Sequence, residues 1–282
     1  MKSFCVFAAV VLCCSSAVSA APKIFVSSNG VDANNGSRNS PKRSLQAAHD
    51  SVDIGGEIVI LDTAGYGPVS ISKDVAVVVP PGVSGFSTVA GNASAIAINA
   101  PQSNVAIRGL ILEGGGAASS GAGISVTNVG QLVVEDTTIR NFGAGIQVTT
   151  AAAANLAVRR VTIRNSGYGL SMIETGSQEA DATVDSTSVD GATNAALYVS
   201  ASGTGSAYMS ASRCRLSNNA IGIEIATGTS TASADACEIS GSGYAFFSAS
   251  NAGTINTRSN NTLSNNGQVI NGSNVLSALS AY

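Results

Sequence analysis

The sequence has 282 residues, of which only 11% are charged, and it contains no tryptophan. Its formal net charge is −3 at pH 7, its lysines stop at Lys73, and its arginines form no basic stripe. This distribution argues against nucleic-acid binding. No stretch after the first residues is apolar and long enough to cross a membrane.

The N-terminus has the pattern of a signal peptide. Lys2 gives a positive start, Phe4–Leu12 form a short apolar core, and Val18–Ala20 offer small residues at a cleavage site before Ala21. We therefore predict that residues 1–20 are removed and that the protein is exported to the periplasm or the extracellular space.

A short strand and one amphipathic helix are predicted next. Residues Ile24–Val26 favour a strand, and a polar loop follows them. Ser40 is a suitable N-cap for a helix, with Pro41 at the first helical position. Apolar residues at helical spacing then share one face: Leu45, Ala48 and Val52. We expect this helix to cover the end of a β core, because an uncovered end would expose strand edges.

The rest of the chain is predicted to be short strands. The first of them are Glu57–Leu61, Val69–Ile71, Val75–Val79, Ala95–Ile98 and Val105–Leu112. From Gly121 to Ile270 a block recurs with aliphatic anchors about 23 to 27 residues apart, a period typical of solenoids. One series of anchors is Ile139, Ile163, Val189, Leu216, Ile239 and Leu263. A second series is Ile124, Ile146, Leu170, Leu197, Ile223, Phe246 and Val269.

Each repeat contains three short segments in which apolar residues alternate with polar ones. Alternation of this kind indicates strands, so the sequence predicts a single-domain, all-β parallel β-helix with three strands per coil. Residues 21–56 would form an N-terminal cap, 57–270 the coils and 271–282 a C-terminal tail.

Opposite charges would meet in adjacent coils at Glu135 and Arg159, at Asp136 and Arg160, and at Arg215 and Glu238. A turn position would carry Asn141, Asn165, Gly191, Asn218, Gly241 and Asn265, which suggests stacked side-chain amides.

The first part of the chain carries motifs of a known group. They include Phe25–Gly30, Asp32–Asn34, Gly55–Ile58 and Gly65–Gly67, and the repeats add Thr-Ile-Arg-Asn elements. With these the chain resembles the secreted bacterial right-handed parallel β-helix proteins of the pectate-lyase-like superfamily. The resemblance implies a right-handed coil. It also implies that the face carrying the Gly-Ile strands is the one on which such proteins commonly place a substrate groove.

Two cysteines remain after removal of the signal peptide. Cys214 and Cys237 occupy equivalent positions in consecutive repeats, so their Cα atoms should stack about 4.8 Å apart. Both a disulfide and a pair of buried thiols fit that spacing.

No residue pattern predicts catalysis, a metal site or a cofactor. The lone histidine, His49, lies on the predicted cap helix without a partner pattern for a catalytic triad. Arg140 and Arg164 stack beside Asp190, with Glu113 upstream, and this group fits a solvated charge ladder better than an active site. Cys/His clusters that would bind zinc are missing from the sequence.

A binding surface is the stronger functional hypothesis. One outward ladder reads Ser125, Gln147, Ser171, Tyr198, Glu224 and Phe247. Tyr198 and Phe247 could stack on sugar rings, while Gln147 and Glu224 could form hydrogen bonds. The sequence thus favours an exported protein that binds carbohydrate or cell-envelope material. Two alternatives stay open: a lyase, hydrolase or epimerase acting on acidic polysaccharide, and a structural or adhesive solenoid. The oligomeric state is open as well.

Overall fold

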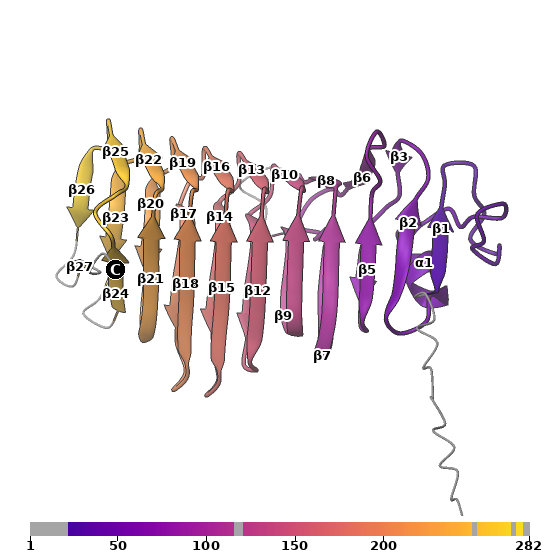
Figure 1. Cartoon of the computed structure of the whole chain (residues 1–282), viewed down its shortest axis with the longest axis horizontal. Coiled ribbons are helices and arrows are strands. Elements are labelled where there is room, and N and C mark those ends of the chain that lie inside the picture. The colour runs from indigo at the N-terminus through magenta and orange to yellow at the C-terminus, as the bar shows by residue number, and fades with distance from the viewer. Residues whose placement is uncertain (1–21, 116–120, 250–252, 272–274, 279–282) are drawn as a thin grey trace, which may run out of the picture.

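Parallel strands stacked along one axis make up most of the fold (Figure 1). The computed structural model describes residues 22–115, 121–249, 253–271 and 275–278. The predicted signal peptide, residues 1–20, lies outside the described residues. The described chain is a single all-β solenoid, and its one helix caps the N-terminal end, as the sequence predicted.

Three strands follow one another in each coil, so the solenoid has three faces. Faces 1 and 2 share a continuous sheet, and face 3 is a second sheet. Two long strands, β7 (Ile96–Arg108) and β9 (Ala122–Glu135), run through both face 1 and face 2. The other strands of face 1 are β4 (Val69–Ile71), β11 (Ala144–Thr150), β14 (Tyr168–Glu174), β17 (Ala195–Ala201), β20 (Ile221–Ile225), β23 (Tyr244–Ser248) and β26 (Gln268–Asn271).

The remaining strands form faces 2 and 3. Face 2 contains β1 (Lys23–Val26), β2 (Gly56–Ile60), β5 (Val75–Val78), β12 (Ala154–Arg159), β15 (Glu179–Asp185), β18 (Ser206–Ser212), β21 (Thr229–Asp235), β24 (Gly253–Thr257) and β27 (Val275–Ala278). Face 3 contains β3 (Ala64–Gly65), β6 (Gly85–Thr88), β8 (Leu110–Glu113), β10 (Thr138–Arg140), β13 (Thr162–Arg164), β16 (Ser188–Asp190), β19 (Arg215–Ser217), β22 (Glu238–Ser240) and β25 (Thr262–Ser264).

The register follows the aliphatic anchors of the sequence. On face 3, Ile139 pairs with Ile163, and the ladder continues to Leu263. On face 1 the predicted series holds up to Phe246, but its partner in the next coil is Ile270. The prediction of Val269 at that place was wrong by one residue. Both residues are aliphatic, so apolarity alone could not distinguish them.

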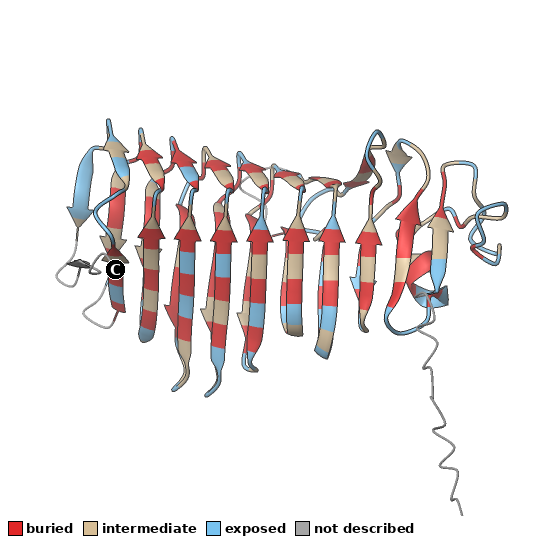
Figure 2. Ribbon diagram, viewed as in Figure 1, coloured by how far each residue is buried: buried red, intermediate tan, exposed pale blue. Residues whose placement is uncertain are grey.

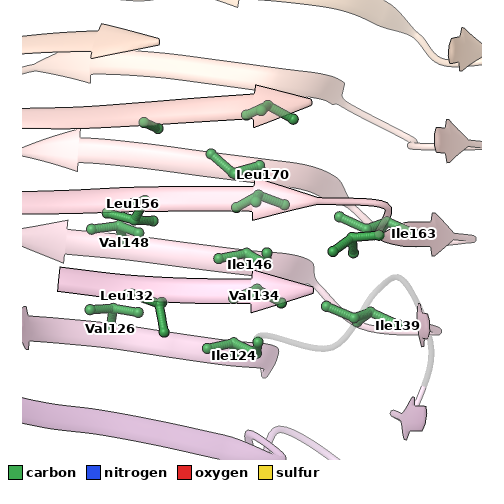
Figure 3. Close-up of a cluster of buried hydrophobic side chains, with 14 of the residues drawn as sticks. Ile124, Val126, Leu132, Val134, Ile139, Ile146, Val148, Leu156, Ile163 and Leu170 are labelled. Carbon is green, nitrogen blue, oxygen red and sulfur yellow. The ribbon is translucent and has the colours of Figure 1, made fainter. Parts of the chain in front are cut away.

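Alternation along each strand places the core inside the coil. Figure 2 shows buried and exposed residues alternating along the strands of face 2. The inward residues pile into columns, and Figure 3 shows Ile124, Ile146 and Leu170 in one of them. Each of these side chains is at most 1% exposed. Every coil therefore covers the apolar surface of its neighbours, which a single coil could not do alone.

The N-terminal end is closed by helix α1 (Leu45–Ser51), which begins later than predicted. The residue that caps it is Ser44, whose hydroxyl oxygen accepts a hydrogen bond from the Ala47 N–H. The predicted start at Ser40 and Pro41 is wrong because Lys42 is held in extended pairing with Val26 instead. Leu45 and Ala48 are fully buried, so the helix covers the core as expected.

Charged side chains on the outside pair between adjacent coils, as the alignment predicted. Arg159 lies 3.5 Å from Glu135, and Arg160 Nε lies 2.7 Å from Asp136. Such exposed pairs add little stability, about 0 to 1 kcal/mol each. They nevertheless confirm the register.

Cys214 and Cys237 stack in adjacent coils as buried free thiols. The Cys214 thiol donates to the Ser212 carbonyl at 3.3 Å. One coil earlier, the Thr187 hydroxyl donates to the Asp185 carbonyl at 3.1 Å in the same way. The cysteines therefore take the place of threonines in an inward ladder.

Candidate binding surface

The predicted binding ladder lies on the outer side of face 1. Tyr198, Glu224 and Phe247 occupy facing positions on β17, β20 and β23, so they are neighbours in consecutive coils. All three side chains are half-buried. The residues on either side of Tyr198 along β17 are Leu197 and Val199, which point into the core. Face 1 thus presents these three side chains to the outside as one column.

Gln147 belongs to the same ladder but lies apart from the other three. It faces Ser171 of the next coil, and Ser171 in turn faces Tyr198. Two coil steps separate Gln147 from Tyr198, which amounts to roughly 10 Å. Ser171 is only 4% exposed and offers little surface in between. The structure therefore brings together three of the four predicted residues and leaves Gln147 at the edge of the surface.

A second aromatic column, which the sequence analysis missed, runs beside the first. Tyr168 on β14 stacks edge-on against Tyr198, with ring centroids 5.2 Å apart. Tyr244 on β23 contacts Phe247, with centroids 5.6 Å apart and the rings tilted by 48°. Between these two tyrosines the column holds Ala195 and Ile221 of the two intervening coils. We call the four rings together with Glu224 the aromatic patch.

The signal for this second column was present in the sequence. Tyr168 and Tyr244 each stand three residues before the ladder position of their own coil. Regular alternation places residues three apart on opposite faces of a strand, so a prediction from alternation alone overlooks these two tyrosines. Reading both columns in register would have placed the two tyrosines beside Tyr198 and Phe247.

Glu224 is the only carboxylate of the aromatic patch. It lies between Tyr198 and Phe247 in the ladder, and burial raises the pKa of its carboxyl. Within the described part of the chain, the carboxyl group of Glu224 forms no ion pair and no hydrogen bond. Burial also raises the pKa of Tyr168, and the charge of Glu224 adds to that effect. The carboxylate is thus held in an apolar frame with its oxygens open to a ligand.

The tyrosine hydroxyls complete the polar part of the patch. Among the described residues, no hydrogen bond engages the hydroxyls of Tyr168, Tyr198 or Tyr244. A tyrosine hydroxyl both donates and accepts, whereas an ionised carboxylate only accepts. The patch therefore offers flat apolar rings, hydroxyl groups of both kinds and one acceptor, arranged along the axis of the solenoid.

The charge ladder on face 3 has the arrangement expected of a solvated surface. Arg140 is ion-paired with Glu113 and faces Arg164, which in turn faces Asp190. Asp190 accepts hydrogen bonds from Ser217 and Asn218 of the following coil. In the residues that the structure describes, no group of three or more His, Cys, Asp or Glu side chains is placed to hold a metal ion. None of the described helices has the length and apolarity of a membrane span.

His49 is a structural residue of the cap. It is 4% exposed, and its Nε2 accepts a hydrogen bond from the Ser72 N–H at 3.3 Å. That bond places the proton of the neutral ring on Nδ1, which lies 3.3 Å from Asp50. The imidazole thus ties helix α1 to the segment after β4.

Comparison with known proteins identifies the coil. Residues 72–208 match the family model described as "Right handed beta helix region". The chain is a right-handed parallel β-helix. The handedness implied by the resemblance is therefore confirmed, together with the fold. No curated protein matches this β-helix.

Solved structures similar to this β-helix include three carbohydrate-active proteins. The GH136 lacto-N-biosidase from Eubacterium ramulus has 10% identity and a TM-score of 0.44, with 91% of this chain and 68% of that chain covered. Pectate lyase Pel9A has 13% identity and a TM-score of 0.46, with 91% and 78% covered. The Azotobacter vinelandii mannuronan C-5 epimerase AlgE4 A-module has 8% identity and a TM-score of 0.26, with 80% and 91% covered. Identities and TM-scores this low say nothing about the chemistry of the present β-helix.

Proposed function

We propose that this β-helix is an exported protein that binds carbohydrate or cell-envelope material through the aromatic patch. Export rests on the signal-peptide pattern of residues 1–20. The observation that carries the binding proposal is the clustering of rings around Glu224. The chain has only six tyrosines, and Tyr168, Tyr198 and Tyr244 lie together here.

The chemistry of the patch suits a saccharide. A sugar ring has C–H-rich faces that pack on aromatic rings and hydroxyl groups at its edge that need hydrogen-bond partners. Half-buried rings supply the first, while the tyrosine hydroxyls and Glu224 supply the second. Because the coils repeat every ~4.8 Å along a straight axis, an extended polymer could contact several coils at once.

Hydrolysis is less well supported than binding. Glycoside hydrolases generally use two carboxyl groups that flank the scissile bond. The four strands that carry the patch, β14, β17, β20 and β23, contain one other carboxylate, Glu174, and that side chain is fully buried inside the coil. Glu224 therefore lacks a second carboxylate on the outer side of these strands.

The test is a glycan array with the mature chain, residues 21–282, followed by calorimetric titration of the glycans that bind. Replacing one stacking ring removes about 1 to 2 kcal/mol of contact, so Tyr198→Ala and Phe247→Ala should each weaken binding roughly 5- to 30-fold. Tyr208→Ala is the matched control, because Tyr208 is an aromatic residue on face 2 and is 36% exposed. An equal loss of affinity in all three variants would place the binding site elsewhere.

The same samples separate binding from turnover. Each glycan that binds is incubated with the protein, and its products are followed by mass spectrometry. Intact glycan after prolonged incubation supports a binding protein. Cleavage that is lost in Glu224→Gln would instead identify an enzyme that uses this carboxylate. An array with no bound glycan would overturn the proposal and favour a structural solenoid.

A further inference from the structure

The strands that carry the aromatic patch are almost free of charge. Strands β14, β17, β20 and β23, and the neighbouring strand β11, contain no lysine, arginine or histidine. Their two acidic residues are Glu174 and Glu224, and Glu174 points into the coil with 0% exposure. A ligand lying along these strands would therefore meet one charge, the carboxylate of Glu224.

Most arginines near the other faces are engaged with acidic partners. Arg164 on β13 of face 3 has Arg140 and Asp190 as its ladder neighbours. Arg160 pairs with Asp136, and Arg213 pairs with Asp185. Further pairs join Arg108 to Glu135, Arg140 to Glu113, Arg215 to Glu238 and Arg258 to Asp235. These cations lie at strands of faces 2 and 3 or at the turns between them. Their charge is largely compensated there, so they supply no positive counterpart to a ligand on face 1.

The apolar surroundings of Glu224 screen the charge of its carboxylate only weakly. Aromatic rings lie on both sides of it in the ladder, and its side chain is half-buried, which raises the pKa of its carboxyl. Its ladder neighbours are Tyr198 on β17 and Phe247 on β23, and neither of these strands contains a lysine, arginine or histidine. A second negative charge placed here is screened weakly and finds no compensating cation.

A ligand that covers Glu224 must also satisfy its oxygens. An ionised carboxylate has only acceptors, so it requires donors from the ligand once water leaves. Sugar hydroxyl groups are donors, whereas the carboxylate of a uronic acid is a second acceptor and repels the first. The same geometry that fits an uncharged sugar therefore opposes a uronate.

We infer that Glu224 determines ligand class at the aromatic patch: it admits uncharged, hydroxyl-rich saccharides and excludes polyuronates. This inference rests on the proposed binding function and narrows it. It also opposes the alternative of an enzyme for acidic polysaccharides at this face, because such an enzyme would need cations where face 1 has none.

The experiment compares uncharged and anionic hexasaccharides on the mature chain at pH 7. The uncharged probes are cellohexaose, xylohexaose, mannohexaose and N-acetylchitohexaose; the anionic probes are galacturonate and mannuronate hexamers. We expect at least one uncharged probe to bind, and both anionic probes to bind at least tenfold more weakly than it. In Glu224→Gln the ratio between the two classes should shrink at least fivefold, because the repulsive charge is gone while the side-chain volume is kept.

The matched control is Glu238→Gln, a carboxylate of β22 on face 3, which should leave the ratio unchanged. Anionic probes that bind as tightly as uncharged ones, or a ratio that Glu224→Gln does not move, would overturn the inference while leaving carbohydrate binding intact. Failure of every probe to bind would count against the proposed function itself. Circular dichroism of each variant checks that it has folded.

Discussion

At the scale of single residues, the corners of the coil explain the recurring asparagines. Asn141, Asn165, Asn218 and Asn265 have φ between 50° and 63°, and Gly191 and Gly241 take the same left-handed conformation at φ 71° and 65°. Asn and Gly tolerate that region best among the common residues. Two of these amides donate to carboxylates, Asn141 to Glu113 and Asn218 to Asp190 at 2.9 Å. Backbone conformation, more than amide stacking, therefore accounts for the ladder.

A second left-handed ladder, which the sequence did not indicate, tests this explanation. Apart from Asp136, its members have side chains that rarely adopt positive φ; the ladder comprises Asp136, Arg160, Ser186, Arg213, Ala236 and Ser259. Ala236 has φ 51° and is exposed, so Ala236→Gly removes strain without removing packing. We expect the variant to be more stable than the wild type, with a free energy of unfolding about 0.5 to 1 kcal/mol larger.

Urea unfolding followed by circular dichroism measures this change. The control is Ala234→Gly, which lies two residues earlier in β21 and is 1% exposed. There the extended backbone gains nothing from glycine, and the loss of a buried methyl group and of backbone order should cost about 1 kcal/mol or more. Destabilisation of similar size in both variants would show that Ala236 is not strained.

At the scale of elements, Asp62 holds the segment after β2 to the segment after β1. Its carboxylate accepts hydrogen bonds from the Ser28 N–H at 2.9 Å and from the hydroxyls of Ser28 and Ser27 at 2.7 and 3.0 Å. The hydroxyl of Tyr66 also donates to it. Burial opposes ionisation, but these bonds prevail and lower the pKa of Asp62 to about 2.

This lowered pKa predicts a loss of stability in acid. The unfolded chain ionises an aspartate near pH ~3.9, so the stabilisation by Asp62 is complete above that pH and is lost as the pH falls towards 2. It amounts to about 1 to 2 kcal/mol.

Asp62→Asn should therefore lose stability at pH 7 and show a smaller further loss between pH 5 and pH 2.5 than the wild type. Urea titrations at the three pH values measure both effects. Asp53→Asn, at an exposed aspartate after α1, should keep the wild-type difference. If Asp62→Asn also kept it, Asp62 would not be the responsible group.

Sequence predicted the repeated elements well and the unrepeated ones less well. The anchors on face 3, such as Ile139 and Ile163, recur in every coil, so one accidental apolar residue does not change the predicted register. The start of α1 occurs once, and there the local signal of Ser40 and Pro41 lost to pairing of Lys42 with Val26, a contact that spacing does not reveal. At the candidate site, the ladder position of Glu224 could be predicted from the repeat. Its apolar surroundings could not, because they depend on rings contributed by three other strands.

At the scale of the whole molecule, the two ends of the solenoid differ. Helix α1 covers the N-terminal end with buried residues, whereas Ile270 in the last coil is 41% exposed although its ladder partner Phe246 is 1% exposed. In the face 3 ladder, Leu216 is 0% exposed, and Leu263 at the end is only partly buried. Stability of a solenoid is close to a sum over coils and their interfaces. The terminal coil should therefore contribute least.

Two identical substitutions in one ladder test this gradient. Leu216→Ala opens a cavity between two packed coils and should lower the free energy of unfolding by about 2 to 5 kcal/mol. Leu263→Ala removes a partly buried side chain that has one ladder partner, Ile239, among the described residues. It should cost less than half as much, since part of the space is already open to water. Urea unfolding of both variants measures the difference, and amide hydrogen exchange should show the strands β25 and β26 exchanging faster than β19 and β20. Equal losses in the two variants would mean that another element covers the last coil. Slow exchange in β26 would lead to the same conclusion, because only a covered strand keeps its amides protected.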